Sequence, residues 1–167
     1  MKKRVTVYWL IPAWPEADLF RDIVHILAKQ FDAPRFKPHL TLCEAARESS
    51  PRQTLQQIRS TRIRLRITGI KQSSKFTQTL IVQFSPNKAL DRLVNALGGS
   101  RPLPNPHVSL IYKSMPASTR RGLGRAIQLP FRHITFDKIQ AVSCVVPTET
   151  AREVKSWRVL ASKPLPR

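Results

Sequence analysis

Two short segments of the sequence carry polar residues whose types and spacing are suited to acid–base chemistry. Residues 38–42 read Pro-His-Leu-Thr-Leu, and residues 106–110 read Pro-His-Val-Ser-Leu. In each segment a histidine and a hydroxyl residue alternate with apolar residues, which is typical of a β-strand with one polar face. The sequence therefore predicts two strands that each present an imidazole and a hydroxyl on one face. The candidate catalytic residues are His39, Thr41, His107 and Ser109.

These four side chains would suit the cleavage of a phosphodiester bond. The reaction needs a base that activates water and an acid that protonates the departing oxygen, and two histidines with pKa values near the reference of about 6.5 can divide these roles. The hydroxyls can donate hydrogen bonds to the non-bridging phosphate oxygens. We expect no cofactor and no metal ion, since the two cysteines, Cys43 and Cys144, form no metal-binding spacing.

The two segments lie at equivalent positions of an internal repeat. The order strand, proline-started helix, loop, Pro-His strand, helix, strand is predicted twice, with His39 and His107 at positions 68 residues apart. A pair of Ile-Thr dipeptides repeats at the nearly equal offset of 67 residues. One strand histidine beside a threonine is most often structural, but two copies in matched frames favour a paired catalytic function. His25 and His133 have no such frame and are interpreted as structural.

The hydrophobic pattern predicts a single α+β domain that spans residues 1–167. We expect two lobes related by a pseudo-twofold axis, each an antiparallel sheet with helices on its outer face, and the histidine strands facing a central cleft. The loop at 147–155 is expected to be irregular. Strands are predicted at residues 4–11, 38–43, 61–70, 76–84, 107–112, 131–136, 139–146 and 157–161, and helices at about 15–31, 51–60, 86–97 and 116–127.

Charge is the second strong feature of the sequence. The chain has a net charge of +19, and residues 50–132 hold 15 basic side chains against a single acidic one, Asp91. Such an excess excludes an acidic or calcium-buffering protein and predicts a polyanionic partner, with nucleic acid as the first candidate. The 41% hydrophobic content is that of a globular chain, and no apolar run reaches the roughly 20 residues of a membrane span. We predict a cytoplasmic location.

Three arginines in the basic region alternate with apolar residues along one expected strand. Arg62, Arg64 and Arg66 point to one face, and the apolar residues between them point to the other. We expect this arginine stripe to face the cleft or its rim and to bind phosphates of RNA or a nucleotide. The alternative interpretation is a solvated strand face.

The paired motif resembles the two-histidine phosphoesterase superfamily, whose signature is a tandem His-x-Thr/Ser pair in two pseudo-symmetric lobes. The resemblance covers nearly the whole chain, and the Trp157-Arg158-Val159 ending is most similar to the plant-type cyclic phosphodiesterases. It implies that Tyr112 helps to hold the phosphate and that Phe76 stacks on a base. The alternatives are a strand-end aromatic for Tyr112 and a core residue for Phe76. Trp9 is interpreted as a core residue because its parity matches Val5 and Val7.

The resemblance implies a metal-independent phosphodiesterase that hydrolyses 2′,3′-cyclic phosphates of nucleotides or RNA ends and leaves a 2′-phosphate. Two alternatives stay open: an RNA 2′-5′ ligase or phosphodiesterase that uses the same histidines, and a non-catalytic basic module that binds RNA ends. The expected partner is a nucleotide cyclic phosphate or an RNA end, with no membrane contact, and the expected state is a monomer. The sequence leaves open which histidine is the base and which the acid.

Overall fold

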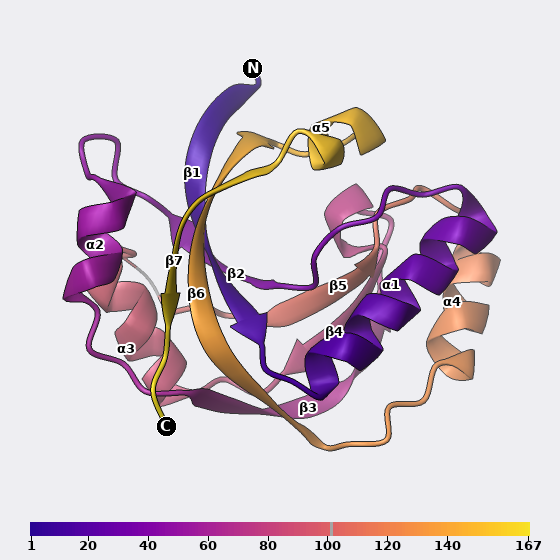
Figure 1. Cartoon of the computed structure of the whole chain (residues 1–167). Helices are drawn as coiled ribbons and strands as arrows, with labels where there is room; N and C mark the ends of the chain where they lie inside the picture. Colours follow the sequence, from indigo (N-terminus) through magenta and orange to yellow (C-terminus); the bar gives the residue numbers. More distant parts are fainter. Residues whose placement is uncertain (101) are drawn as a thin grey trace.

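The computed structural model describes residues 1–100 and 102–167, and the seven strands found there form one sheet in which every pairing is antiparallel. The strand order is β1-β2-β5-β4-β3-β6-β7, and β1 also pairs with β6, so that the first six strands close into a ring (Figure 1). The strands are β1 (Lys3–Pro12), β2 (Leu40–Glu44), β3 (Ile63–Gln72), β4 (Leu80–Phe84), β5 (His107–Ile111), β6 (His133–Val146) and β7 (Arg158–Pro164).

The longer helices lie in two groups beside the sheet, and α5 lies apart from both (Figure 1). In Figure 1, α1 and α4 lie on the right, α2 and α3 on the left, and α5 at the top beside the end of β6. No helix in the described part of the chain is long and apolar enough to cross a membrane. The helices are α1 (Glu16–Phe31), α2 (Pro51–Gln57), α3 (Lys88–Ala96), α4 (Ala117–Ala126) and α5 (Ala151–Lys155), and a 3₁₀ turn, η1, covers Phe76–Gln78.

Helix α1 illustrates why these elements form and where the core lies. Pro15 precedes its first residue, and Glu16 and Asp18 place negative charge in its first turn, where the helix dipole favours it. Phe20 and Leu27 recur at helical spacing on one face and pack into the main hydrophobic core. That core also takes residues from α2 and α3, so it fills the space between the sheet and the helices.

The two histidine strands, β2 and β5, are direct neighbours in the sheet. They pair in antiparallel orientation with Leu40 opposite Val108, the residues that follow the two histidines. Both apolar residues are fully buried in the main core. The opposite face of the two strands therefore carries the polar residues of both motifs. The expected α+β class and antiparallel strands are confirmed, but the two expected sheets are joined into one.

Two sequence-based assignments in the C-terminal part of the chain are wrong for identifiable reasons. Residues 133–146 form one strand instead of two, because β6 pairs with β3 near its start and with β1 and β7 along the rest. At Asp137, between the two expected strands, the β1–β6 register has a bulge through which β6 continues. The polar loop contains α5, whose Thr150 and Glu153 form a capping box.

Alternate residues of β1 belong to two different hydrophobic clusters. Tyr8 and Leu10 are fully buried in the main core, whereas Val7 and Trp9 belong to a smaller cluster on the other face of the strand. Both faces of β1 are apolar, so the alternation that marks most strands does not show which face meets the helices. Trp9 is buried as expected of a core residue, and it packs with Val7 in the smaller cluster rather than in the main core.

The core assignment makes a prediction about stability. Leu10→Ala should lower the free energy of unfolding by about 2–5 kcal/mol, because Leu10 has no exposed surface and its truncation leaves a cavity. Leu160→Ala is the matched control: Leu160 lies in β7 and is 47% exposed, so the change should stay within about 0.5 kcal/mol. Urea denaturation followed by circular dichroism measures both, and equal losses would contradict the packing described above.

Candidate active site

The four polar residues of the two motifs line one cavity of about 600 Å³. On either side of the Leu40–Val108 pair, the antiparallel register places Ser109 across from His39 and His107 across from Thr41. The side chains thus lie next to one another on neighbouring strands, whereas the sequence suggested two pairs facing each other across a cleft between separate sheets. The residues that line this cavity from the two motifs are His39, Thr41, His107 and Ser109.

Both histidines are held by the same hydrogen bond. His39 Nδ1 lies 2.7 Å from the carbonyl oxygen of Lys37, and His107 Nδ1 lies 2.8 Å from that of Asn105. A carbonyl oxygen only accepts, so Nδ1 carries the hydrogen in each ring and Nε2 has the free lone pair when the ring is neutral. A proline separates each histidine from its acceptor and restricts the preceding residue to extended backbone, which helps to fix the carbonyl.

His39 is enclosed by aromatic rings. The indole of Trp9 stacks on its imidazole with a centroid distance of 3.6 Å and an interplanar angle of 10°, and Trp157 approaches edge-on at 5.5 Å. Burial lowers the pKa of His39 to about 4, and the charges of His107 and Lys37 act in the same direction. His39 is therefore neutral at neutral pH, with Nε2 able to accept a proton.

The hydroxyls of Thr41 and Ser109 differ in whether they are free to donate a hydrogen bond to a ligand. Thr41 is exposed on the cavity wall, so its hydroxyl can donate to a ligand. Ser109 is buried, and its Oγ already donates to the carbonyl oxygen of Thr77 at 2.8 Å. To donate to a ligand, Ser109 would have to turn away from Thr77. The sequence-based expectation that both hydroxyls donate to phosphate fits Thr41 directly and Ser109 after such a rotation.

The bond from Ser109 also fixes the wall formed by η1. Buried Thr79 donates to the carbonyl oxygens of Phe76 and Lys113, each at 3.0 Å, and so ties the turn to the segment that follows β5. These bonds hold Lys75 and Phe76 on the cavity wall. The expected start of a strand at Phe76 is wrong, because Phe76 lies in η1 and β4 begins only at Leu80.

The two aromatic residues that the resemblance implied both reach the cavity. Phe76 stacks on Tyr112, with a centroid distance of 5.9 Å and an interplanar angle of 23°. Tyr112 is 4% exposed, and burial raises the pKa of its phenol above the usual range. The phenol therefore stays neutral and offers a ligand a donor rather than a charge.

The cavity has two further aromatic walls to which sequence reasoning gave no functional role. Trp9 and Trp157 line it together, with ring centroids 5.2 Å apart in an edge-on arrangement. For Trp9, the signal available in the sequence was an N-terminal strand with apolar residues on both faces. Trp157 stood in the sequence only as part of a terminal motif.

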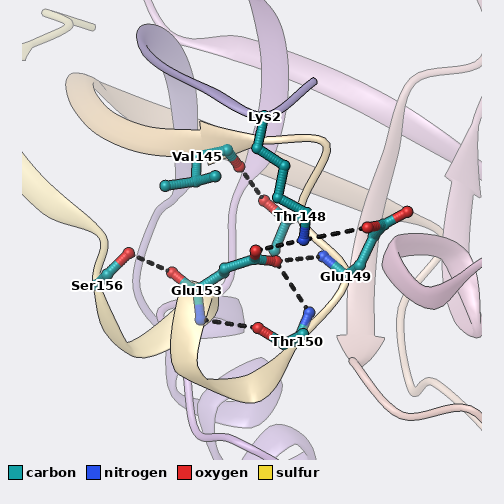
Figure 2. A network of polar contacts seen from close by, with 7 residues as sticks. All are labelled: Lys2, Val145, Thr148, Glu149, Thr150, Glu153 and Ser156. Carbon is teal, nitrogen blue, oxygen red and sulfur yellow. Dashed lines mark hydrogen bonds and ion pairs between the residues drawn. The ribbon is translucent and has the colours of Figure 1, made fainter.

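The loop after β6 forms another rim, and polar contacts with the N-terminus hold it in place (Figure 2). Lys2 pairs with the carboxylates of Glu149, at 3.1 Å, and of Glu153. Glu153 also accepts hydrogen bonds from the backbone N–H groups of Glu149 and Thr150, at 2.8 and 3.1 Å. The hydrogen bond from Lys2 is the main reason why the pKa of Glu153 falls to about 2.

The arginine stripe does not line this cavity. Arg62, Arg64 and Arg66 are exposed, and the apolar residues between them, Ile63 and Leu65, are buried in the main core. The structure thus corresponds to the solvated strand face that was the alternative interpretation. Within residues 1–100 and 102–167, no three or more His, Cys, Asp or Glu side chains gather in a way that could hold a metal ion.

Comparison with solved structures identifies the fold, although no family model and no curated protein matches the sequence. Escherichia coli LigT in complex with 3′-AMP aligns with a TM-score of 0.58 and 17% identity, over 98% of this chain and 99% of LigT. The chain has the LigT fold. A structure described as a phosphoesterase aligns with a TM-score of 0.57 and 16% identity, over 98% and 99% of the two chains.

The LigT fold confirms the resemblance stated from the two motifs at the level of architecture. Apo LigT aligns at 19% identity over 99% of both chains, with a TM-score of 0.55. LigT has also been solved with phosphate, with NADP⁺ and with ATP, so that protein accepts several phosphate-bearing ligands. At these identities the similarity identifies a shared fold, and the chemistry of this chain has to be argued from its own cavity.

The burial of His39 predicts how stability depends on pH. The unfolded histidine binds a proton near pH 6.5, whereas the folded one does so only near pH 4, so stability is lost as the pH falls between these values. The loss should approach about 3 kcal/mol, because a tenfold difference in proton affinity between the folded and unfolded chain corresponds to about 1.4 kcal/mol. His39→Gln should remove this part of the acid dependence, as measured by urea denaturation at pH 7 and pH 4.

His25→Gln provides the control, because His25 lies on α1 outside the cavity. This variant should keep the wild-type decline in stability between pH 7 and pH 4. If wild type and His39→Gln lose the same stability over this range, His39 is not buried in its neutral form.

Proposed function

We propose that this chain is a phosphodiesterase that hydrolyses 2′,3′-cyclic phosphates of nucleotides or RNA ends without a metal ion. The observation that carries the proposal is the matched state of the two histidines: both line one cavity, and both use Nδ1–H on a carbonyl oxygen two residues earlier. Each ring therefore presents Nε2 for proton transfer. The LigT fold supports the proposal, since LigT binds 3′-AMP and phosphate.

The environments of the two histidines support different roles. His39 is buried and neutral at neutral pH, as a general base must be. His107 is half-buried and open to solvent, and by its place in the cavity it is the group left to protonate the leaving oxygen.

The proposed reaction balances with these two groups alone. His39 Nε2 takes a proton from water while the water oxygen bonds to phosphorus, and the bond between phosphorus and the 3′-oxygen breaks. His107 Nε2 gives its proton to that oxygen, which leaves a 2′-phosphate, the product implied by the resemblance. Thr41 donates to a non-bridging oxygen, where charge shifts in the transition state. Exchange with solvent then restores both histidines.

The walls of the cavity suit the rest of a nucleotide. Phe76 lies beside Tyr112 on the cavity wall, where an aromatic face can stack on a base, an interaction worth about 1–3 kcal/mol. Lys75 adds a positive charge to the same wall. We assign Phe76 to the base and Tyr112 and Lys75 to the neighbourhood of the phosphate.

The direct test is hydrolysis of 2′,3′-cyclic AMP and of a short RNA ending in a 2′,3′-cyclic phosphate, both in the presence of EDTA. His39→Ala and His107→Ala should each lower kcat by roughly 10²–10⁴-fold, the usual contribution of one general acid or base. His25→Gln should keep wild-type activity, because it lies outside the cavity. Product analysis by ³¹P NMR should show the 2′-phosphate.

Three outcomes would overturn the proposal in different ways. Loss of activity in EDTA would show that a metal ion takes part. Joining of RNA ends without net hydrolysis would favour the ligase alternative. Tight RNA binding with no turnover of either substrate would favour a binding module.

If His39 is the general base, its low pKa determines how kcat/KM depends on pH on the acid side. The kcat/KM should stay high well below pH 6 and fall only as His39 becomes protonated near pH 4, since this step removes the base. An acid limb centred at pH 6–7 that is unchanged by Trp9→Leu would contradict a base held neutral by burial against Trp9.

A further inference from the structure

A second cavity lies directly behind the aromatic wall of the candidate active site. Its volume is about 370 Å³, and it shares two lining residues, Trp9 and Trp157, with the cavity that holds the histidines. Phe36, which packs edge-on against His39 with a centroid distance of 6.3 Å, also lines it. The two cavities are therefore separated by the thickness of a few aromatic rings.

Three cationic side chains surround this second cavity. Arg35 and Lys37 precede β2, and Lys155 ends α5. The side chains that line the cavity include no carboxylate, and in the described part of the chain none of these three cations forms an ion pair. Partial burial and the charge of Lys138 lower the pKa of Lys37, so the site concentrates positive charge that has no partner.

The lining also offers what a nucleobase needs. Trp157 and Phe36 supply aromatic surface, and Val142, Val154 and Val159 supply aliphatic surface. The indole Nε1–H of Trp157 is buried without an acceptor among the described residues. An aromatic and aliphatic hollow ringed by cations is the arrangement by which proteins bind single-stranded nucleic acid.

We propose that this second cavity binds the nucleotide that adjoins the reacting one in an RNA strand. Arg35, Lys37 and Lys155 would bind its phosphate, and its base would lie against the aromatic wall. The inference rests on the proposed function: a strand whose cyclic end lies at the histidines has the second cavity as its neighbour, because the two cavities share Trp9 and Trp157. RNA ends are then the preferred substrates, and a mononucleotide occupies only the first cavity.

In this proposal, the cations that contact RNA are those of the second cavity and not those of the arginine stripe. Arg62, Arg64 and Arg66 line neither cavity, although they belong to the most basic part of the sequence. Of these two groups of cations, only those of the second cavity lie beside the histidine cavity.

The test compares two double variants that remove the same charge. Arg35→Gln/Lys155→Gln changes the second cavity, and Arg62→Gln/Arg64→Gln changes the stripe. The substrates are 2′,3′-cyclic AMP and a four-nucleotide RNA with a 2′,3′-cyclic phosphate end. For the cavity variant, we expect the ratio of kcat/KM for RNA to that for the mononucleotide to fall about tenfold, which corresponds to about 1.4 kcal/mol.

Salt dependence provides a second readout. Loss of one phosphate contact on a single strand should make the slope of log KM for RNA against log salt shallower by about 0.7. The stripe variant should keep the wild-type ratio and slope. The inference is overturned if the stripe variant lowers the ratio as much as the cavity variant, or if the cavity variant keeps the wild-type ratio.

Binding without turnover separates this inference from the proposed function. Fluorescence anisotropy with a 3′-phosphate-ended RNA of the same length measures affinity whether or not the chain is an enzyme. Weaker binding in the cavity variant alone supports the second site even if no cyclic phosphate is hydrolysed. Equal binding by both variants overturns it even if hydrolysis is established, as does an equal loss of affinity for AMP and RNA, which would indicate a site for a free nucleotide.

Discussion

The antiparallel pairing of β2 with β5 is the constraint on which the candidate site depends. Leu40 and Val108 pair backbone to backbone, and both bury their side chains under the helices. Because side chains alternate along a strand, burial of these two residues forces both histidines and both hydroxyls onto the opposite face. The four groups therefore lie on a rigid sheet rather than on loops, and the core that stabilises the fold also orients the site.

A second constraint fixes the chemistry of the histidines. Each ring is oriented by a carbonyl oxygen two residues earlier in the chain. This local hydrogen bond is present in both motifs, and it determines that Nδ1 carries the hydrogen. The rings then differ only in surroundings. Trp9 and Trp157 enclose His39 and favour its neutral form, whereas His107 stays half-exposed. One motif copied twice thus gives two histidines in different native environments.

The region of the sequence with the most positive charge supplies only some of the cations near the candidate active site. Most of the positive charge lies in residues 50–132, yet the stripe of three arginines there points to solvent away from the cavity. The cations near the histidines come from Lys75 and from segments of modest net charge. A dense run of charge in sequence raises the field of the whole molecule, whereas the charges that contact a bound strand are those that the fold brings to its path.

The sequence by itself determined the α+β class, most of the elements, and the four polar residues that share a cavity, because burial of apolar residues with period two fixes a strand face locally. It could not determine the faces of β1, since both are apolar, nor that the strands would join in one sheet. Only the tertiary structure placed Trp9 on His39, Ser109 on Thr77 and the arginine stripe in solvent. Those contacts join residues far apart in the chain, and they depend on strand order and register, which local patterns do not encode.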